Sequence, residues 1–177
     1  GAIPGMVVLC PADTEETRRC VEAAILYDGP VYLRFGRMAV PFIFEPDYEI
    51  EIGKGVKLKD GKDVTIISTG LMTGMSLAAA EALKGQGIDA RVVNIHTIKP
   101  LDKDAVNACI DEIGKIITVE DHNIINGLGG AVCEVVAEAG KGIVKRIGIQ
   151  DQFGQSAPYE RLLAINGITV ENIIETA

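Results

Sequence analysis

Two arginines flank a Phe-Gly pair in the segment Arg34-Phe35-Gly36-Arg37. They lie at the end of a predicted strand over residues 31–35, and the ends of parallel strands are where α/β proteins bind their ligands. A guanidinium group is planar and always charged, so Arg34 and Arg37 suit the binding of a phosphate or a carboxylate. A surface ion pair explains the same spacing equally well, and the pattern leaves both interpretations open.

A second polar cluster follows the predicted strand at residues 116–120 and runs into a glycine-rich segment. Two carboxylates beside one imidazole could raise the pKa of His122 and make it a proton carrier, although such a group is also common in surface loops. We expect a structured interface or a structural loop next to a ligand, rather than a catalytic group. The candidate residues are Glu120, Asp121, His122, Gly127, Gly129 and Gly130.

Other chemistry lacks its usual signals. The chain has no G-x-S-x-G motif, and its two histidines, His96 and His122, are far apart with no third ligand at helical or hairpin spacing. The segment at residues 69–74 has neither G-x-G-x-x-G nor a Walker lysine, so its glycines predict a tight turn and close helix packing. No catalytic, cofactor-binding or metal-binding residue is assigned.

Charge and composition exclude several partners. The 177 residues carry a formal net charge of −8, and their 17 lysines and arginines are dispersed, so we expect no nucleic-acid partner. There is no run of 18 apolar residues and no secretory signal at residues 1–6, so we expect no membrane association and a cytoplasmic location. The four cysteines lack zinc-site spacing and are expected to be reduced core residues.

The hydrophobic pattern predicts an α/β fold. A strand at residues 6–10, a helix within 12–28 and a strand at 31–35 predict a parallel pair, and Asp13 or Thr14 could cap the helix. A linker and domain boundary follow at residues 38–48. Alternation over residues 49–59 predicts a half-exposed antiparallel strand pair, with a turn at Asp60-Gly61.

Four apolar, β-branched runs with helical segments between them occupy the rest of the chain. This repeated order predicts a three-layer fold with a mostly parallel sheet of about five strands. The strands are expected at residues 64–69, 90–95, 116–120 and 143–149, and the helices at 76–84, 102–113, 130–139, 158–164 and 170–175.

Several segments, in this order along nearly the whole chain, together resemble the C-terminal part of a transketolase, especially the short C-terminal subunit of split forms. They are Ile3-Pro4-Gly5-Met6, Pro11-Ala12-Asp13 with Glu16, Gly29-Pro30-Val31-Tyr32-Leu33-Arg34, Val119-Glu120-Asp121-His122 with Gly127-Leu128-Gly129-Gly130, and Asp151 to Leu163 with Phe153-Gly154-Gln155-Ser156.

The resemblance implies that residues 1–46 are the end of a pyrimidine-binding domain plus a linker, and that residues 47–177 are the transketolase C-terminal domain. It implies a transferase of the pentose phosphate pathway that moves a two-carbon ketol group between sugar phosphates. The complete enzyme would use thiamine diphosphate and Mg. The family's residues for these groups fall outside the matched segments, so we expect no cofactor on this chain alone and no activity from it alone.

The resemblance also implies partners and one binding role. The expected partners are a transketolase N-terminal subunit, or a missing N-terminal portion, and a second copy in a homodimer. The family's phosphate-binding arginine before the Pro-x-Asp segment is replaced here by Cys10, whereas deoxyxylulose phosphate synthases use an arginine from the segment that matches residues 33–37. Arg34 or Arg37 could therefore contact substrate phosphate.

Three alternatives remain open: a deoxyxylulose phosphate synthase, the β chain of a 2-oxoacid dehydrogenase, and a non-catalytic α/β interaction or regulatory module. The Gly-Gln-Ser-Ala-Pro sequence at residues 154–158 favours a transketolase over the other two enzymes. In each case, two parallel strands and one helix cannot cover their own faces and edges. Residues 1–35 are therefore expected to pack on the C-terminal domain or on a partner copy.

Overall fold

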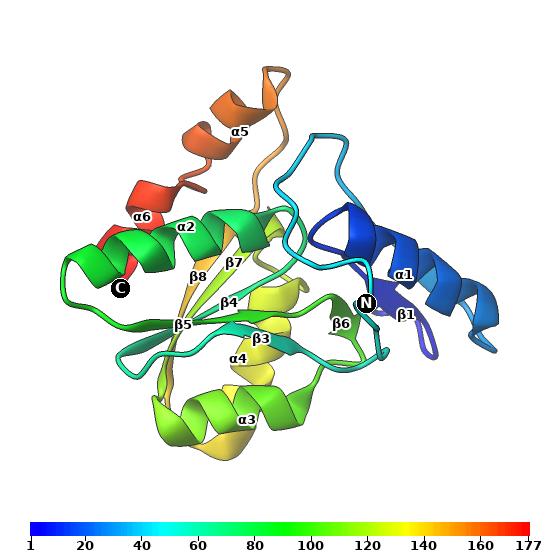
Figure 1. Cartoon of the computed structure of the whole chain (residues 1–177), viewed down its shortest axis with the longest axis horizontal. Coiled ribbons are helices and arrows are strands. Elements are labelled where there is room, and N and C mark those ends of the chain that lie inside the picture. Colours follow the sequence, from blue (N-terminus) through cyan, green and yellow to red (C-terminus); the bar gives the residue numbers. More distant parts are fainter.

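Two sheets of unequal size organise residues 1–177, all of which the computed structural model describes (Figure 1). In the larger sheet, three neighbouring pairs of strands are parallel, and only the pair at one edge is antiparallel. Its strands, in spatial order, are β3 (Val56–Lys59), β5 (Ala90–Asn94), β4 (Val64–Ser68), β7 (Lys115–Asn123) and β8 (Ile143–Ile149). The predicted mostly parallel sheet of five strands is confirmed.

Helices cover both faces of this sheet, as expected for strands that are buried throughout. Every residue of β4 and β5 is buried. One face packs against α2 (Met72–Gly85) and α6 (Val170–Thr176), and the other packs against α3 (Lys103–Glu112) and α4 (Leu128–Ala139). Figure 1 shows these two helical layers on opposite sides of the strands, which confirms the three-layer fold.

The beginning of the chain forms a small unit beside the larger sheet. Its elements are β1 (Val7–Leu9), α1 (Thr14–Leu26) and β2 (Val31–Leu33), and β1 and β2 are parallel as predicted. A strand that the sequence did not predict, β6 (Thr97–Lys99), pairs antiparallel with the other edge of β1. Because β6 directly follows β5, the unit packs on the larger domain through a shared three-stranded sheet (Figure 1).

The prediction of a strand pair over residues 49–59 is wrong. Only β3 forms there, and β5 lies between β3 and β4, so the Asp60-Gly61 turn does not join neighbouring strands. The turn instead crosses the start of β5, where the backbone N–H groups of Lys62 and Asp63 both donate to the Asp89 carbonyl at 3.0 Å. A Cβ at residue 61 would overlap the backbone of Ala90, which explains the glycine.

Most of the remaining elements match their predicted positions. The strand β7, however, continues to Asn123, so Glu120, Asp121 and His122 lie in the strand rather than in a loop after it, and α2 begins at Met72 rather than Ser76. After β8, residues 150–156 are exposed, and α5 (Tyr159–Ile165) leads into α6. All four cysteines are free, and Cys10, Cys20 and Cys109 are buried. None of the helices combines the length and the apolar character needed to cross a lipid bilayer.

Candidate functional site

A cavity of about 100 Å³ lies between the N-terminal unit and the end of β7, and it gathers most of the candidate residues. A larger cavity of about 390 Å³ adjoins it, but among the candidate residues that cavity contacts only Gly127, so the chemistry lies at the smaller one. The residues that line the smaller cavity are Gly1, Val8, Cys10, Tyr32, Arg34, Thr69, Ile98, Glu120, Asp121, His122, Asn126 and Gly127.

Arg34 reaches this cavity from the coil that follows β2. Its backbone N–H donates to the Leu9 carbonyl at 2.8 Å, which continues the pairing of β1 with β2. Its Nη2 donates to the Asp121 carbonyl at 2.8 Å and forms an ion pair with the Asp121 carboxylate, and its Nη1 points at Cys10 Sγ, 3.9 Å away. Arg37, in contrast, is exposed, forms no ion pair and does not line the cavity.

Glu120 is fully buried and stabilises the start of α4. Its two carboxylate oxygens accept hydrogen bonds from the backbone N–H groups of Leu128 at 2.7 Å and Gly129 at 2.8 Å, where the helix dipole favours negative charge. Burial raises the pKa of Glu120, and the two N–H donors oppose that effect.

Two of the three candidate glycines are required by close contacts. A Cβ at Gly127 would overlap Oε2 of Glu120, and a Cβ at Gly129 would lie 2.8 Å from Oγ1 of Thr118. Gly130 meets only an ordinary contact, at 3.7 Å from the Ile124 carbonyl. Gly127 and Gly129 therefore allow the start of α4 to approach β7.

His122 is exposed, and neither neighbouring carboxylate hydrogen-bonds to its ring. Its Nδ1 lies 2.8 Å from the carbonyl oxygen of Asn123, which can only accept, so Nδ1 carries the proton. The carboxylate of Glu120 is 4.0 Å away and already accepts hydrogen bonds from two N–H groups at the start of α4. The carboxylate of Asp121 forms the ion pair with Arg34 and accepts a hydrogen bond from Tyr159. The proton carrier considered from the sequence therefore lacks a hydrogen-bonded acid partner.

Cys10 and Tyr159 also belong to this site, although the sequence did not single them out as site residues. Burial raises the pKa of the Cys10 thiol, although the nearby Arg34 guanidinium acts in the opposite direction. The Tyr159 hydroxyl donates to Oδ2 of Asp121 at 2.8 Å. The one signal in the sequence was the place of Tyr159 within the segment Asp151 to Leu163, because its partner Asp121 lies 38 residues earlier and no local spacing links the two.

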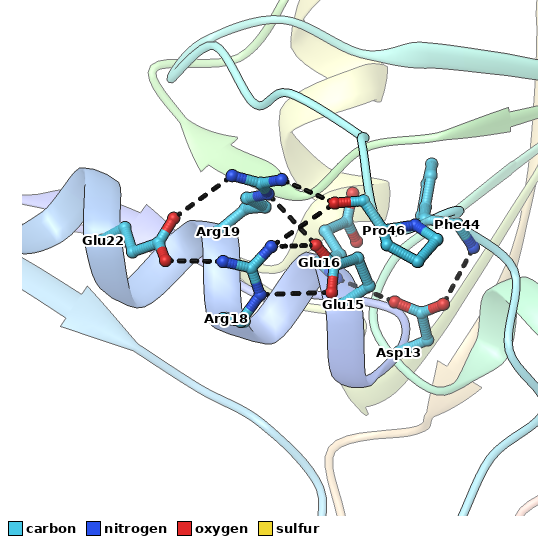
Figure 2. A network of polar contacts seen from close by, with 8 residues as sticks. All are labelled: Asp13, Glu15, Glu16, Arg18, Arg19, Glu22, Phe44 and Pro46. Atoms are coloured by element: carbon cyan, nitrogen blue, oxygen red, sulfur yellow. Dashed lines mark hydrogen bonds and ion pairs between the residues drawn. The ribbon is translucent and has the colours of Figure 1, made fainter.

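A second polar cluster joins α1 to the segment after β2. Asp13 is the N-cap of α1, because one of its carboxylate oxygens accepts from the Glu16 N–H at 2.8 Å. The other oxygen accepts from the N–H groups of Ile43 at 2.7 Å and Phe44 at 2.9 Å, as Figure 2 shows for Phe44. One carboxylate thus fixes both a helix start and a loop.

The exposed side of α1 is covered by charged pairs. Arg18 and Arg19 both bind Glu15 and Glu22, and Arg19 also donates to the Pro46 carbonyl at 2.7 Å (Figure 2). The Arg18–Glu22 pair is about half exposed, and exposed ion pairs contribute little stability each. They leave this side of α1 without free arginines for an anion.

Glu16 joins α1 to the larger domain through a buried hydrogen bond. Its Oε1 accepts from the side-chain amide of Asn94, at the end of β5, at 2.7 Å and from the Tyr48 hydroxyl at 3.2 Å, while Oε2 accepts from the Ala12 N–H at 2.6 Å. Burial raises the pKa of Glu16 to about 7, although these donors favour its charged form.

Comparison with known proteins gives this architecture a family. The model of the transketolase C-terminal domain matches residues 53–173, and the model of the transketolase pyrimidine-binding domain matches residues 1–42. The chain belongs to the transketolase family. Its larger sheet is the transketolase C-terminal domain, and its N-terminal unit matches part of the pyrimidine-binding domain.

Individual relatives support the same family assignment. The "Putative transketolase C-terminal section" of Methanocaldococcus jannaschii is 45% identical over 175 residues, which are 97% of this chain and 54% of that protein. A 6-deoxy-6-sulfo-D-fructose transketolase subunit of Clostridium sp. is 38% identical over 99% of this chain and 54% of its own length. The chain therefore spans about half the length of these relatives.

A solved structure has the same fold. It is described as a split gene transketolase, inactive beta4 tetramer, and it superposes with a TM-score of 0.95 at 42% identity. The match covers 99% of this chain and 57% of the other. The transketolase fold thus includes both the five-stranded sheet and the small N-terminal unit.

Proposed function

We propose that this chain is the C-terminal section of a transketolase that transfers a two-carbon ketol group between sugar phosphates. The observation that carries the proposal is the likeness to a split gene transketolase over 99% of the chain. We place the boundary between the two domains at residues 46 and 47, within the segment that neither family model matches. We also place the reaction in the pentose phosphate pathway and in the cytoplasm.

The chain contributes scaffold and one phosphate-binding arginine, for which Arg34 is the better candidate. Arg34 lines the cavity and its Nε and part of its Nη1 remain without acceptors, whereas Arg37 is exposed and does not line the cavity. Glu120 and the glycines at 127 and 129 hold the loop at the start of α4, and their contacts support a structural role.

We propose that segments outside this chain hold thiamine diphosphate and Mg in the complete enzyme. No group of three or more His, Cys, Asp or Glu side chains could hold a metal ion. The cavity beside Arg34, at about 100 Å³, is smaller than the clefts of about 300 Å³ or more that hold such ligands, and the adjoining cavity of about 390 Å³ has a single carboxylate, Glu134, in its lining. In the proposed enzyme, other segments supply the cofactor site.

The proposed partners are an N-terminal transketolase section, as a separate subunit or in the same polypeptide, and a second copy of this chain. Light scattering of the purified protein, alone and with the N-terminal section, measures both associations. We expect a homodimer alone and a larger complex on mixing; a monomer under both conditions would contradict this part of the proposal.

The decisive experiment is an assay of ketol transfer from xylulose phosphate to ribose phosphate. We expect no activity from the 177 residues with thiamine diphosphate and Mg, and activity once the N-terminal section is supplied. Arg34→Ala should raise KM for the phosphorylated sugars by about tenfold or more, the effect of losing a charged hydrogen bond. Arg37→Ala, the matched control, should change it less. Transfer by the isolated 177 residues would overturn the division of labour proposed here.

A second candidate function is the formation of 1-deoxy-D-xylulose 5-phosphate. A 1-deoxy-D-xylulose-5-phosphate synthase of Heliobacterium modesticaldum is 35% identical over 99% of this chain, although the match covers 28% of that protein. Formation of that product by the complete enzyme, in the absence of ketol transfer, would favour this candidate over the first.

A further inference from the structure

The guanidinium group of Arg34 is held through one nitrogen, Nη2, while its other two nitrogens still have free N–H donors. The Arg34 side chain is 36% exposed, and a long side chain so placed would ordinarily sample many rotamers. Both hydrogens of Nη2 are used, one on the carbonyl and one on the carboxylate of Asp121. The donors left over are Nε–H and one hydrogen of Nη1, since the other Nη1 contact is the weak one to Cys10.

Asp121 is itself fixed by a third element. Its second carboxylate oxygen accepts from the hydroxyl of Tyr159, at the first residue of α5. Burial and the adjacent Asp121 raise the pKa of Tyr159, so the phenol keeps its proton and stays a donor. The Asp121 side chain is only 17% exposed, so this carboxylate is largely shielded from solvent.

Arg34, Asp121 and Tyr159 thus form a bridge that connects three parts of the chain, namely the end of β2, the end of β7 and the start of α5. Arg34 and Asp121 are 87 residues apart, and Tyr159 is a further 38 residues along. A guanidinium held in one orientation loses less conformational entropy when it binds an anion.

From this geometry we propose that Asp121, itself held by Tyr159, is a positioning residue that orients the Arg34 guanidinium toward a phosphate group of the sugar substrate. The inference rests on the proposed function, because it assigns Arg34 a substrate phosphate. Asp121 does not touch the substrate. It acts through Arg34, and Tyr159 acts through Asp121.

If Asp121 instead competes with the substrate phosphate for Arg34, removing its charge should strengthen phosphate binding. A carboxylate beside an arginine weakens the attraction of that arginine for an anion, so a purely competing Asp121 would lower phosphate affinity. Asp121→Asn removes the charge but keeps an acceptor for Arg34 and a polar partner for Tyr159. If positioning dominates, this variant binds sugar phosphates more weakly; if competition dominates, it binds them more tightly.

The test measures KM and kcat of the complete enzyme with a phosphorylated ketose and with its unphosphorylated counterpart. We expect Asp121→Asn to raise KM for the phosphorylated ketose by about tenfold, as for the loss of a charged hydrogen bond, with little change in kcat. Tyr159→Phe should act in the same direction and more weakly. The unphosphorylated ketose should be unaffected, as should the control Asp111→Asn, which alters an exposed ion pair with Lys141.

The double variant separates the possible failures. In an Arg34→Ala background, Asp121→Asn should have no further effect on KM, since the two residues act in series. If Arg34→Ala alone leaves KM unchanged, the phosphate role of Arg34 in the proposed function fails. If Arg34→Ala raises KM but Asp121→Asn lowers it, leaves it unchanged or affects both ketoses equally, the positioning role is overturned while the proposed function stands.

Discussion

The carboxylate of Glu16 in α1 accepts a hydrogen bond from the side-chain amide of Asn94, which ends β5, at 2.7 Å. Asn94 in turn accepts from the hydroxyl of Thr73 in α2 at 2.9 Å. A buried chain of polar groups therefore runs from the N-terminal unit into the larger domain. Such networks stabilise only when every member has a partner, so this contact makes the packing of the unit sensitive to the charge on Glu16.

Glu16 and His96 are expected to give the stability of the chain opposite dependences on pH. Burial raises the pKa of Glu16 from 4.5 to about 7, so the stability it favours is complete below pH 4.5 and is lost as pH rises through about 7. Burial lowers the pKa of His96 from 6.5 to about 4, so its contribution is complete above pH 6.5 and is lost as pH falls toward 4. Between pH 4.5 and 6.5 the two effects oppose one another.

Glu16→Gln removes one of these two effects. The variant should lose stability on acidification from pH 6.5 to 4.5 more steeply than the wild type, because the contribution of His96 remains while the opposing contribution of Glu16 is gone. The destabilisation relative to wild type should be greater at pH 5 than at pH 8, by up to about 3 kcal/mol from the usual conversion of a pKa difference. Urea unfolding at several pH values measures it.

The matched control is Glu22→Gln on the same helix, whose carboxylate is half exposed. It should leave the pH dependence unchanged. A Glu16→Gln variant with the same pH profile as the wild type would show that Glu16 stays ionised throughout.

Gly127→Ala should destabilise the chain by about 1–3 kcal/mol, as for an overpacked site. The new Cβ would overlap the Glu120 carboxylate and disturb the two hydrogen bonds that start α4. Thermal or urea unfolding measures the loss. Gly85→Ala is the control, because a Cβ there meets nothing within 4 Å. It should be neutral or stabilising by up to about 1 kcal/mol, and equal losses from both changes would contradict the steric argument.

Thiol labelling under native conditions should modify Cys133 first. Cys133 is the one half-buried cysteine, whereas Cys10, Cys20 and Cys109 are buried and burial raises the pKa of each. One thiol should react quickly in the native chain and four in urea. The fast phase should disappear in Cys133→Ser; its persistence would mean that a buried cysteine is accessible.

The sequence predicted those parts of the fold that depend on local pattern. The strands β4, β5, β7 and β8 are apolar, β-branched runs, and their order along the chain was enough to predict a three-layer fold. The strand β6 was missed because it has three residues and exists through its pairing with β1, about 90 residues earlier. The strand pair predicted within residues 49–59 was wrong for a similar reason, since the partner of β3 is β5, which lies beyond α2.

The candidate site, too, could be predicted only where it depends on local sequence pattern. The glycine run and the acidic residues 120–121 could be recognised as structured from their spacing, and the resemblance pointed to Arg34 or Arg37 without deciding between them. The bridge between Arg34, Asp121 and Tyr159 could not be predicted, because it depends on how the N-terminal unit packs on the larger domain. The sequence likewise indicated Asp13 or Thr14 as the helix cap, but the second role of Asp13 at Ile43 and Phe44 depends on the path of the loop.

That second role gives a prediction that separates the two functions of Asp13. Asp13→Ala removes the cap of α1 and leaves the N–H groups of Ile43 and Phe44 without their acceptor, so it should cost about 2 kcal/mol or more. Asp13→Asn keeps one acceptor oxygen and should cost less. Urea unfolding measures both, and Thr14→Ala, at an exposed neighbouring position, should have little effect.

Trypsin cleavage after Arg37 reports on the loop alone, because Arg37 is exposed within the segment that Asp13 holds. Both Asp13 variants should be cut there faster than the wild type, since the amide group of asparagine cannot accept from Ile43 and Phe44 while its oxygen caps the helix. Asp13→Asn would then combine a nearly intact helix with a released loop. If its cleavage rate equals that of the wild type, the loop is held by contacts other than the Asp13 carboxylate, and the two roles do not belong to one side chain.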